Sequence, residues 1–548
     1  MMSPSRFPDT GNESGALSTC CRLAHASVPL LWGVFLGLLI PLATQAADAQ
    51  SRQSPGEQIY NRGTSLSGDP ITAYVGEDAV ALPASAVPCG SCHGPDGRGR
   101  PEGGLTPSDI TWSQLTKSYG HRHDYGRDHP AFDDASTVTA IAAGLDPAGN
   151  RLDRAMPRYS MSKEDSQALL DYLKRLEYET DAGITDDYIQ LATLLPLSGP
   201  AAPLGAVLSA VMRAFVDELN AKGGLHGRRI GLRVLPLGNT PAEALVHLEQ
   251  AIEREEIFAV VSAYSMDIEE SLYDLVERER VPLIGPLTLR PPAGSALSRY
   301  TFQLLPTREQ QVRVLVDYAV QSTEDSRVNG IVAGPTTTEV RALAAAGDAQ
   351  GRSHGWAQFR SFNYEPGTLD ADRLAEMLKV TRSQTLFFFG SALELSAVLE
   401  AAAQMGQAPA VFLLSDTVTP SLFEAPLAFD GRVFIAYPSL PRDVSDKGRA
   451  EFSALMEGHS LPKEYLSVQV NAYAAGAILA EAIKRAGRDL SRERLINALE
   501  SLYRFETGLT PPVTFTLNQR VGALGAHVVK LDLSEKRYTP VGAWRGLD

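Results

Sequence analysis

The sequence predicts a multidomain protein in which an all-α domain precedes a larger α/β domain of two lobes. Its 548 residues are too many for one compact core, since domains run to roughly 100–200 residues. An amphipathic helical pattern, with Leu169, Leu170 and Leu173 on one side, closes the first part near residue 178. Short apolar runs then alternate with amphipathic helices, which is typical of βαβ units and parallel sheets.

Residues 1–47 are predicted to be a signal peptide. The run 28–43 is apolar and uncharged, follows Arg22, and has the length of a signal-peptide core. Small residues come next, and we expect cleavage near Ala46 to Ala49 and release into the periplasm. An inner-membrane anchor facing the periplasm is the alternative, although the run is short and contains two prolines.

The net charge and the number of cysteines indicate which partners and which cellular compartment to expect. The formal net charge of −15 gives the chain no electrostatic reason to bind nucleic acid. Two of the four cysteines, Cys20 and Cys21, precede the apolar run and should leave with the signal peptide. The mature protein would keep only Cys89 and Cys92. A large exported protein with no further cysteine for disulfides suggests a bacterial periplasm.

Residues 89–93 read Cys-Gly-Ser-Cys-His, the pattern of covalent haem c attachment. The two thiols add to the vinyl groups of the macrocycle, and His93, next in the chain, is held beneath the iron. A redox dithiol and half of a zinc site are the alternatives. No second cysteine pair supplies further zinc ligands, and a loop rich in Gly and Pro follows the motif instead of a βαβ unit. We therefore predict one covalent haem.

Met156 is the candidate for the sixth iron ligand. The following proline biases it toward an extended conformation, which suits a residue presented to a metal. Met161 is a rival, and His121, His123 or His129 would give a bis-His haem instead. A Met/His pair raises the potential relative to bis-His. A six-coordinate iron also leaves no open position for a substrate, which argues against an enzyme.

The segments GEQIYNRG, CGSCHGPDGRG and MPRYSMSKEDSQALLDYLKRL resemble the class I cytochrome c family. The resemblance covers about residues 54–178. It implies a small all-helical fold whose terminal helices pack across each other over the haem. An insert rich in Ala, Pro and Gly between Gly63 and Cys89 departs from the family. The loop 119–125 carries polar residues, which either line the haem edge or face solvent.

Residues 179–187 form a short acidic linker, and the α/β pattern starts at Tyr188. We expect helices over 204–220, 242–254 and 269–279. The expected strands are the apolar runs 189–195, 230–235, 258–262, 281–284, 330–332, 385–389, 411–414 and 432–437.

The run LLPLSGPAAPLGAVLSAVMRAFVDELNAKGGLHGRRIGLRV resembles the type I periplasmic binding proteins. The similarity is to their branched-chain amino acid and amide branch, which includes the Leu/Ile/Val-binding proteins. It continues to the C-terminus and implies two Rossmann-like lobes that close on a small molecule about a hinge. Within 188–548, lobe 1 would hold about 188–306 and 440–515, and lobe 2 about 307–439.

The second resemblance also implies a ligand site, with hydroxyls and backbone N–H groups in lobe 1 for a carboxylate and an acid in lobe 2 for an amine. The serine-rich run usual in lobe 1 is missing. Met266 and Leu287 make the predicted carboxylate site more apolar. Thr338 replaces an expected aromatic residue. Amino acid specificity is therefore not expected to transfer. The matching residues, each of which is also a common turn or cap residue, are Ser198, Ser265, Thr288, Ser391 (where an aromatic is expected) and Asp416.

These patterns favour a periplasmic monohaem cytochrome whose fused domain binds a small molecule. One-electron transfer would be linked to oxidation or sensing of a periplasmic metabolite, with a dehydrogenase or another cytochrome as redox partner. The alternative is a solute-binding component of an ABC transporter for an amino acid, amide or related molecule, with the haem as a redox sensor and a permease as partner. An enzyme with five-coordinate haem is a third hypothesis.

Overall fold

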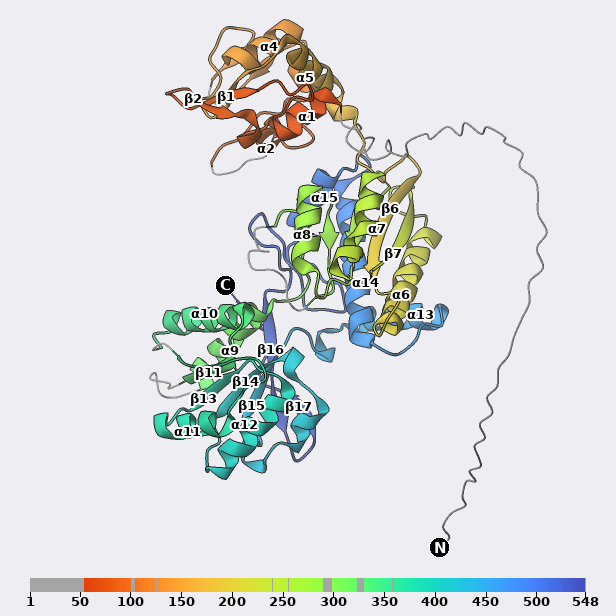
Figure 1. Cartoon of the computed structure of the whole chain (residues 1–548). Helices are drawn as coiled ribbons and strands as arrows, with labels where there is room; N and C mark the ends of the chain where they lie inside the picture. Colours follow the sequence, from red (N-terminus) through yellow and green to blue (C-terminus); the bar gives the residue numbers. More distant parts are fainter. Residues whose placement is uncertain are drawn as a thin grey trace, which may run out of the picture. The chain divides into compact units, whose positions relative to one another are not determined.

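A computed structural model describes residues 54–547 except 100–103, 124–125, 239, 255, 289–297, 323–329 and 357–358. The predicted signal peptide, with Cys20 and Cys21, lies outside the described residues. The described chain contains a mainly helical N-terminal region and two α/β lobes, drawn in sequence colours in Figure 1. This confirms the predicted fold class.

The N-terminal region is built on helices, as expected, and adds a small sheet in the order β2-β1-β5. Strands β1 and β2 form a hairpin inside the insert that departs from the family pattern. The larger elements are α1 (Pro55–Arg62), β1 (Thr72–Val75), β2 (Val80–Pro83), α2 (Cys89–His93), α3 (Trp112–Leu115), β3 (His121–Arg122), β4 (Asp128–His129), α4 (Asp134–Ala143), β5 (Arg158–Ser160) and α5 (Lys163–Arg175).

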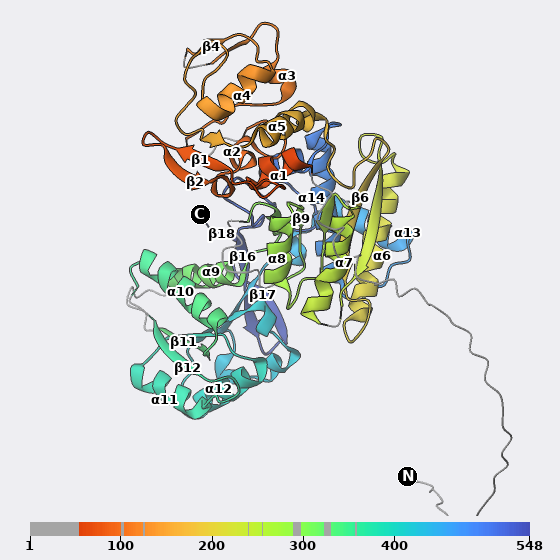
Figure 2. The same ribbon diagram turned by 45° about the horizontal axis from the view of Figure 1, so that its top comes forward.

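Helices α1 and α5 cross at close range, as the cytochrome resemblance implies, and both views show them side by side (Figures 1 and 2). A Cβ added to Gly56 would lie 2.0 Å from the carbonyl oxygen of Ala168, so the crossing needs glycine there. The rings of Tyr60 and Tyr172 pack beside the crossing, with centroids 5.4 Å apart. Apolar residues from both helices form the core of the region.

Lobe 1 contains a five-stranded parallel sheet in the order β10-β9-β8-β6-β7. Helices α7 and α8 cover one face of the sheet, and α6, α13, α14 and α15 cover the other. The elements are β6 (Tyr188–Leu195), α6 (Ala202–Ala221), β7 (Arg229–Pro236), α7 (Pro241–Glu253), β8 (Ala259–Val261), α8 (Glu269–Arg278), β9 (Leu283–Ile284), β10 (Thr301–Phe302), α13 (Asp446–Gly458), α14 (Leu466–Ala486) and α15 (Arg492–Glu500).

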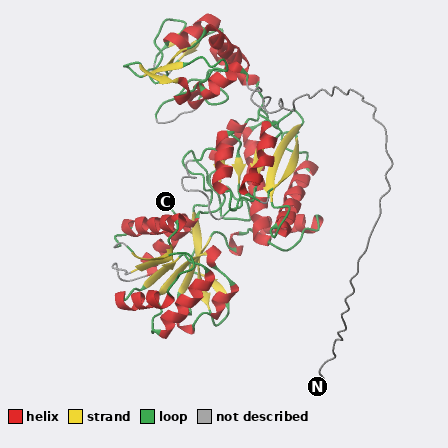
Figure 3. Ribbon diagram, viewed as in Figure 1, coloured by secondary structure: helices red, strands yellow, loops and turns green. Residues whose placement is uncertain are grey.

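Lobe 2 contains a sheet in the order β12-β11-β13-β14-β15-β16-β17, with β18 (Arg545–Gly546) on β16. Helices lie on both of its faces, as Figure 3 shows for each lobe. The elements are α9 (Arg308–Ser322), β11 (Gly330–Pro335), α10 (Thr338–Ser353), β12 (Arg360–Tyr364), α11 (Ala371–Thr381), β13 (Thr385–Phe388), α12 (Ala392–Gln404), β14 (Ala410–Leu414), β15 (Val433–Tyr437), β16 (Gly525–Asp532) and β17 (Arg537–Pro540).

Two features of the lobes go beyond the sequence prediction. Strand β16, from the C-terminal part of the chain, pairs antiparallel with β15 and with β17 and so extends the sheet of lobe 2. Helix α14 is long and apolar enough to cross a membrane by length and composition alone. Its residues Ala472, Ile478 and Ile483 are fully buried in the lobe 1 core, which is how a core helix of a folded lobe behaves.

Candidate functional site

The two cysteines and the histidine of the motif share one short helix, α2, which begins directly after Pro88. Cys89 and Cys92 are three residues apart, so they lie on the same side of the helix. Both are free thiols in the structure, with Cys89 half-buried and Cys92 exposed. This arrangement offers two thiols to one edge of a ligand and places His93 immediately beside them.

Two buried tyrosines fix the helix at its ends. The hydroxyl of Tyr60, on α1, donates to the carbonyl oxygen of Gly94 at 2.6 Å. The hydroxyl of Tyr159, on β5, donates to the carbonyl oxygen of Val87 at 2.6 Å. Because each bond spans a long stretch of sequence, folding of α1 and β5 sets the position of α2.

The ring of His93 is oriented for metal binding. Its Nδ1 lies 2.9 Å from the carbonyl oxygen of Ser108. A carbonyl oxygen can only accept, so Nδ1 carries the hydrogen and Nε2 keeps its lone pair. Metal-bound histidines commonly donate their other ring N–H to a carbonyl oxygen in this way. Burial also lowers the pKa of His93, which favours the neutral imidazole that a metal requires.

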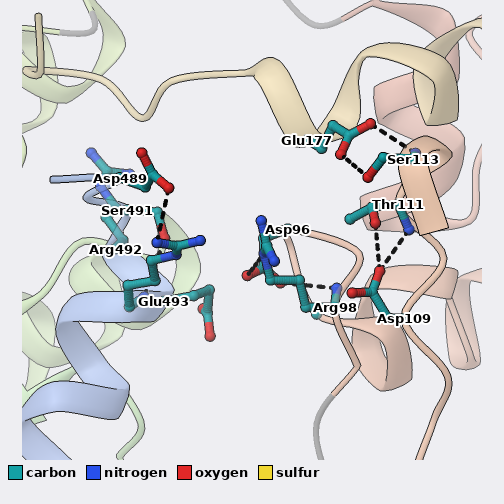
Figure 4. A network of polar contacts seen from close by, with 12 residues as sticks. Asp96, Arg98, Asp109, Thr111, Ser113, Glu177, Asp489, Ser491, Arg492 and Glu493 are labelled. Atoms are coloured by element: carbon teal, nitrogen blue, oxygen red, sulfur yellow. Dashed lines mark hydrogen bonds and ion pairs between the residues drawn. The ribbon is translucent and has the colours of Figure 1, made fainter. Parts of the chain in front are cut away.

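The segment that offers the Ser108 carbonyl is itself held in place. The Ile110 amide donates to the Gly97 carbonyl oxygen at 2.7 Å. Asp109 accepts from the backbone N–H of Thr111 at 2.9 Å and from its hydroxyl at 2.6 Å, as Figure 4 shows. The acceptor of the His93 ring is therefore part of an ordered loop.

The environment of Cys89 disfavours a redox dithiol. Burial raises the pKa of Cys89 to about 12. The first cysteine of a thiol–disulfide exchange motif has a lowered pKa, because the thiolate is the nucleophile. A thiol among apolar groups, beside a second thiol and an imidazole with a free lone pair, fits a covalently bound haem instead.

The two methionine candidates lie in different surroundings. Met161 packs against the apolar cluster that contains Tyr159 and Leu173, so it has a packing role. Met156 is half-buried in the bend before β5, where its amide donates to the Asp153 carbonyl oxygen at 3.2 Å. The guanidinium of Arg158 donates to the Met156 carbonyl oxygen. The assignment of Met156 as the sixth ligand stays a prediction, favoured over Met161 by this difference.

The three rival histidines meet on the hairpin of β3 and β4. The Nε2 atoms of His123 and His129 are 3.3 Å apart, and the ring of His121 lies 4.4 Å from that of His123 between centroids. Arg127 donates to His123 Nε2 at 2.7 Å, and His129 Nδ1 donates to the Pro130 carbonyl oxygen at 2.8 Å. Two of the three rings therefore have polar partners within their own hairpin.

In lobe 1, the predicted ligand residues follow successive strands of the sheet. Ser198 is exposed in the loop after β6. Ser265 is fully buried, and its hydroxyl has no hydrogen-bond partner among the described residues. The Thr288 hydroxyl donates to Glu269 Oε1 at 2.6 Å. Glu269 starts α8, and Met266 is exposed nearby in the sequence. The hydroxyl of Thr288, a predicted anion-binding group, is therefore already bonded to an acidic side chain.

In lobe 2, two of the positions have structural partners. Ser391 is the N-cap of α12 and forms a capping box with Glu394. Asp416 Oδ2 lies 3.1 Å from Nε of Arg308, which also pairs with Glu339. The Arg308 side chain is only 10% exposed, so it is held against these acids. Asp416, the acid expected to bind a ligand amine, is therefore already paired with a buried arginine.

Comparison with known proteins defines the family. The periplasmic binding protein family model matches residues 188–536, and the cytochrome c family model matches residues 85–177. The chain belongs to the periplasmic binding protein family, and it carries a cytochrome c region ahead of that domain. Both predicted resemblances are thereby confirmed.

The individual relatives agree with this family. The chain is 23% identical over 314 residues to the Leu/Ile/Val-binding protein BraC3 of Rhizobium johnstonii, covering 57% of this chain and 83% of the relative. A putative branched-chain amino acid ABC transporter from Rhodospirillum rubrum is similar in structure, with a TM-score of 0.54 and 20% identity over 65% of this chain and 100% of that chain.

A fatty acid ABC transporter substrate-binding protein from Thermomonospora curvata has a TM-score of 0.52 and 19% identity, over 68% of this chain and 95% of that chain. At this level of identity, the solved structures show the fold of the lobes alone.

Several residues that shape these sites were not indicated by sequence reasoning. Ser108 supplies a backbone carbonyl, which no side-chain pattern reveals. Arg308 lies far from Asp416 in sequence, and only the sheet of lobe 2 brings the start of α9 beside the end of β14. Tyr60 and Tyr159 lie inside the quoted cytochrome segments, but the partners of their hydroxyls become visible only in the folded chain.

Proposed function

We propose that this chain is a periplasmic one-electron carrier with one haem c. Thioether bonds from Cys89 and Cys92 would hold the haem, with His93 and Met156 as axial ligands. The observation that carries the proposal is the His93 Nδ1 bond to the Ser108 carbonyl oxygen, which leaves Nε2 available beside two free thiols. A bound haem supplies a reversible Fe(III)/Fe(II) couple.

The residues of the chain would set the properties of that couple. His93, oriented by the Ser108 carbonyl oxygen, would bind the iron through Nε2. Met156 on the other side would raise the potential relative to a second histidine. With both positions filled, no open position remains for a substrate, so the region would exchange electrons with a periplasmic dehydrogenase or another cytochrome.

A redox titration of the full-length exported protein tests this function. We expect one step with a one-electron slope of about 59 mV per tenfold change in the ratio of oxidised to reduced protein. A two-electron slope of about 30 mV would identify a dithiol couple of Cys89 and Cys92 and contradict the proposal. A colourless protein with no step in the titration would contradict it too.

For the fused domain, we propose a neutral small ligand rather than a zwitterionic amino acid. In lobe 1, Glu269 and Glu270 lie in the first turn of α8 and Asp267 comes just before its N-cap, so a ligand carboxylate there would meet repulsion. In lobe 2, Asp416 Oδ2 lies 3.1 Å from Arg308 Nε, so this carboxylate already has a cationic partner where a ligand ammonium group would bind. Both ends of an amino acid therefore lack the partners that its charges need.

The ligand class can be tested with matched probes on the full-length protein. L-leucine and 3-methylbutan-1-ol share an isobutyl group, and only leucine carries the ammonium and carboxylate charges. We expect the alcohol to raise the unfolding temperature more than leucine does at equal concentration. A larger increase in unfolding temperature with leucine would contradict the neutral ligand and support amino acid binding.

The alternative is a solute-binding component of an ABC transporter with a redox-sensing haem region. It is supported by the relatives, which are described as Leu/Ile/Val-binding proteins. Tight leucine binding, together with an adjacent permease gene, would favour this alternative. Reduction of the haem by a neighbouring periplasmic dehydrogenase would favour electron transfer.

A further inference from the structure

The small sheet of the N-terminal region has one continuous apolar face. Ala73, in the middle strand, lies opposite Tyr159 of β5 and Leu82 of β2. Val75 lies opposite Val80. Directly opposed residues share a face and alternate residues of one strand return to it, so all five belong to the same face. Apart from the Tyr159 hydroxyl, this face is apolar.

The opposite face has a mixed composition. It carries Thr72, Tyr74, Arg158 and Ser160, together with Ala81. Such alternation, with one apolar and one mixed face, is the pattern of a sheet with one face covered and one face in water.

The apolar face is covered at one side only. Tyr159 is 7% exposed and Ala73 is fully buried, whereas Leu82 is 37% and Val80 56% exposed. Figure 1 shows the β1–β2 hairpin extending away from the helices of its region. Two large aliphatic side chains on an exposed edge strand are unfavourable unless another group covers them.

The same face adjoins the haem-binding residues. Tyr159 donates to the Val87 carbonyl oxygen, two residues before Cys89, and Cys89 packs against the apolar cluster that contains Tyr159 and Ala73. Strand β5 runs antiparallel to β1, so Met156, two residues before β5, lies at the end of the sheet near the β1–β2 turn. The uncovered part of the face therefore continues from the apolar cluster that Cys89 packs against.

We propose that Val80 and Leu82 form an apolar wall against the edge of the porphyrin, and that this insert shields the haem from water. The proposal rests on the proposed haem. The hydrophobic shell of a metal site sets solvent access and local dielectric, and through them the reduction potential. The wall stabilises the ferrous state relative to the more highly charged ferric state and raises the midpoint potential.

Opposite charges at Val80 test the wall directly in the full-length, haem-loaded protein. Val80→Asp lowers the midpoint potential, because a carboxylate close to the iron stabilises the ferric form. Val80→Lys has a higher midpoint than Val80→Asp. The matched control is Tyr74, 38% exposed on the opposite face of the same hairpin. The difference between the Asp and Lys variants is larger at residue 80 than at residue 74.

Val80→Thr provides a milder test in case the charged variants fold poorly or do not attach haem. It keeps the shape of valine and adds one hydroxyl, and it lowers the midpoint in the same direction by less. If the midpoints vary no more at residue 80 than at residue 74, and Val80→Thr equals the wild type, the wall is wrong although the haem is present. If the wild-type protein has no haem by mass, the proposed function itself fails.

Discussion

The cytochrome region and the two lobes differ in how available their predicted site residues are. In the cytochrome region, Cys89 and Cys92 are free thiols, and His93 keeps one ring nitrogen available. In the lobes, Asp416 is paired with Arg308 and Ser391 caps a helix. A covalent cofactor requires two thiols and a ligand at fixed spacing, whereas the lobes need only their apolar cores to fold. Sequence spacing can therefore indicate the haem residues, whereas the availability of the lobe residues depends on which distant side chains pack beside them.

The largest effect is expected from removing both thiols. Cys89→Ala/Cys92→Ala should abolish covalent haem, because no other described cysteine is present to form a thioether. Haem staining of the denatured protein measures the loss. The matched control, Cys20→Ala/Cys21→Ala in the predicted signal peptide, should keep full staining. Covalent haem in the first variant would contradict the motif assignment.

Alanine substitutions of Met156 and Met161 should show which methionine is the iron ligand and which is a packing residue. Met156→Ala should lose the absorbance feature of methionine–iron ligation and lower the midpoint potential. Met161→Ala should keep both and destabilise the region by about 1–3 kcal/mol, since its half-buried side chain packs against the core. Loss of the absorbance feature in Met161→Ala alone would reverse the assignment.

The paired acids of lobe 2 give a smaller, structural effect. Arg308→Met leaves Asp416 and Glu339 without their shared cation, and we expect a loss of about 1–3 kcal/mol in unfolding free energy. Asp416→Asn keeps the Arg308–Glu339 pair and should cost less. Calorimetric unfolding of the full chain compares the two variants. Equal stability of wild type and Arg308→Met would mean that the pairing does not hold lobe 2 together.

The smallest effect concerns the histidine hairpin. Burial, followed by the charge of Arg127, lowers the pKa of His123 from 6.5 to about 4. Between these values the unfolded chain binds a proton that the folded chain does not, so stability falls as the pH drops from about 6.5 to about 4. Above pH 6.5 both states are neutral and the effect vanishes.

His123→Gln tests this pH dependence. The unfolding temperature of the variant should vary less between pH 7.5 and pH 5 than that of the wild type. An identical pH dependence would show that other groups are responsible.

The sequence predicted most of the fold because its signals were local or periodic. The strand at 189–195 and the helix at 204–220 lie within β6 and α6 as observed. Strand β16 was not assigned, because its pairing with β15 joins segments about 90 residues apart. The haem motif was readable from spacing alone. The Arg308–Asp416 pair was not, since it depends on tertiary packing between distant segments.

The intact mass of the mature protein, purified from the periplasm of a host with a working haem-ligation system, tests the central claim most directly. The account predicts a mass that exceeds the polypeptide by one haem and keeps that excess after denaturation. A mass equal to the polypeptide, or lower by the two hydrogens of a Cys89–Cys92 disulfide, would contradict it.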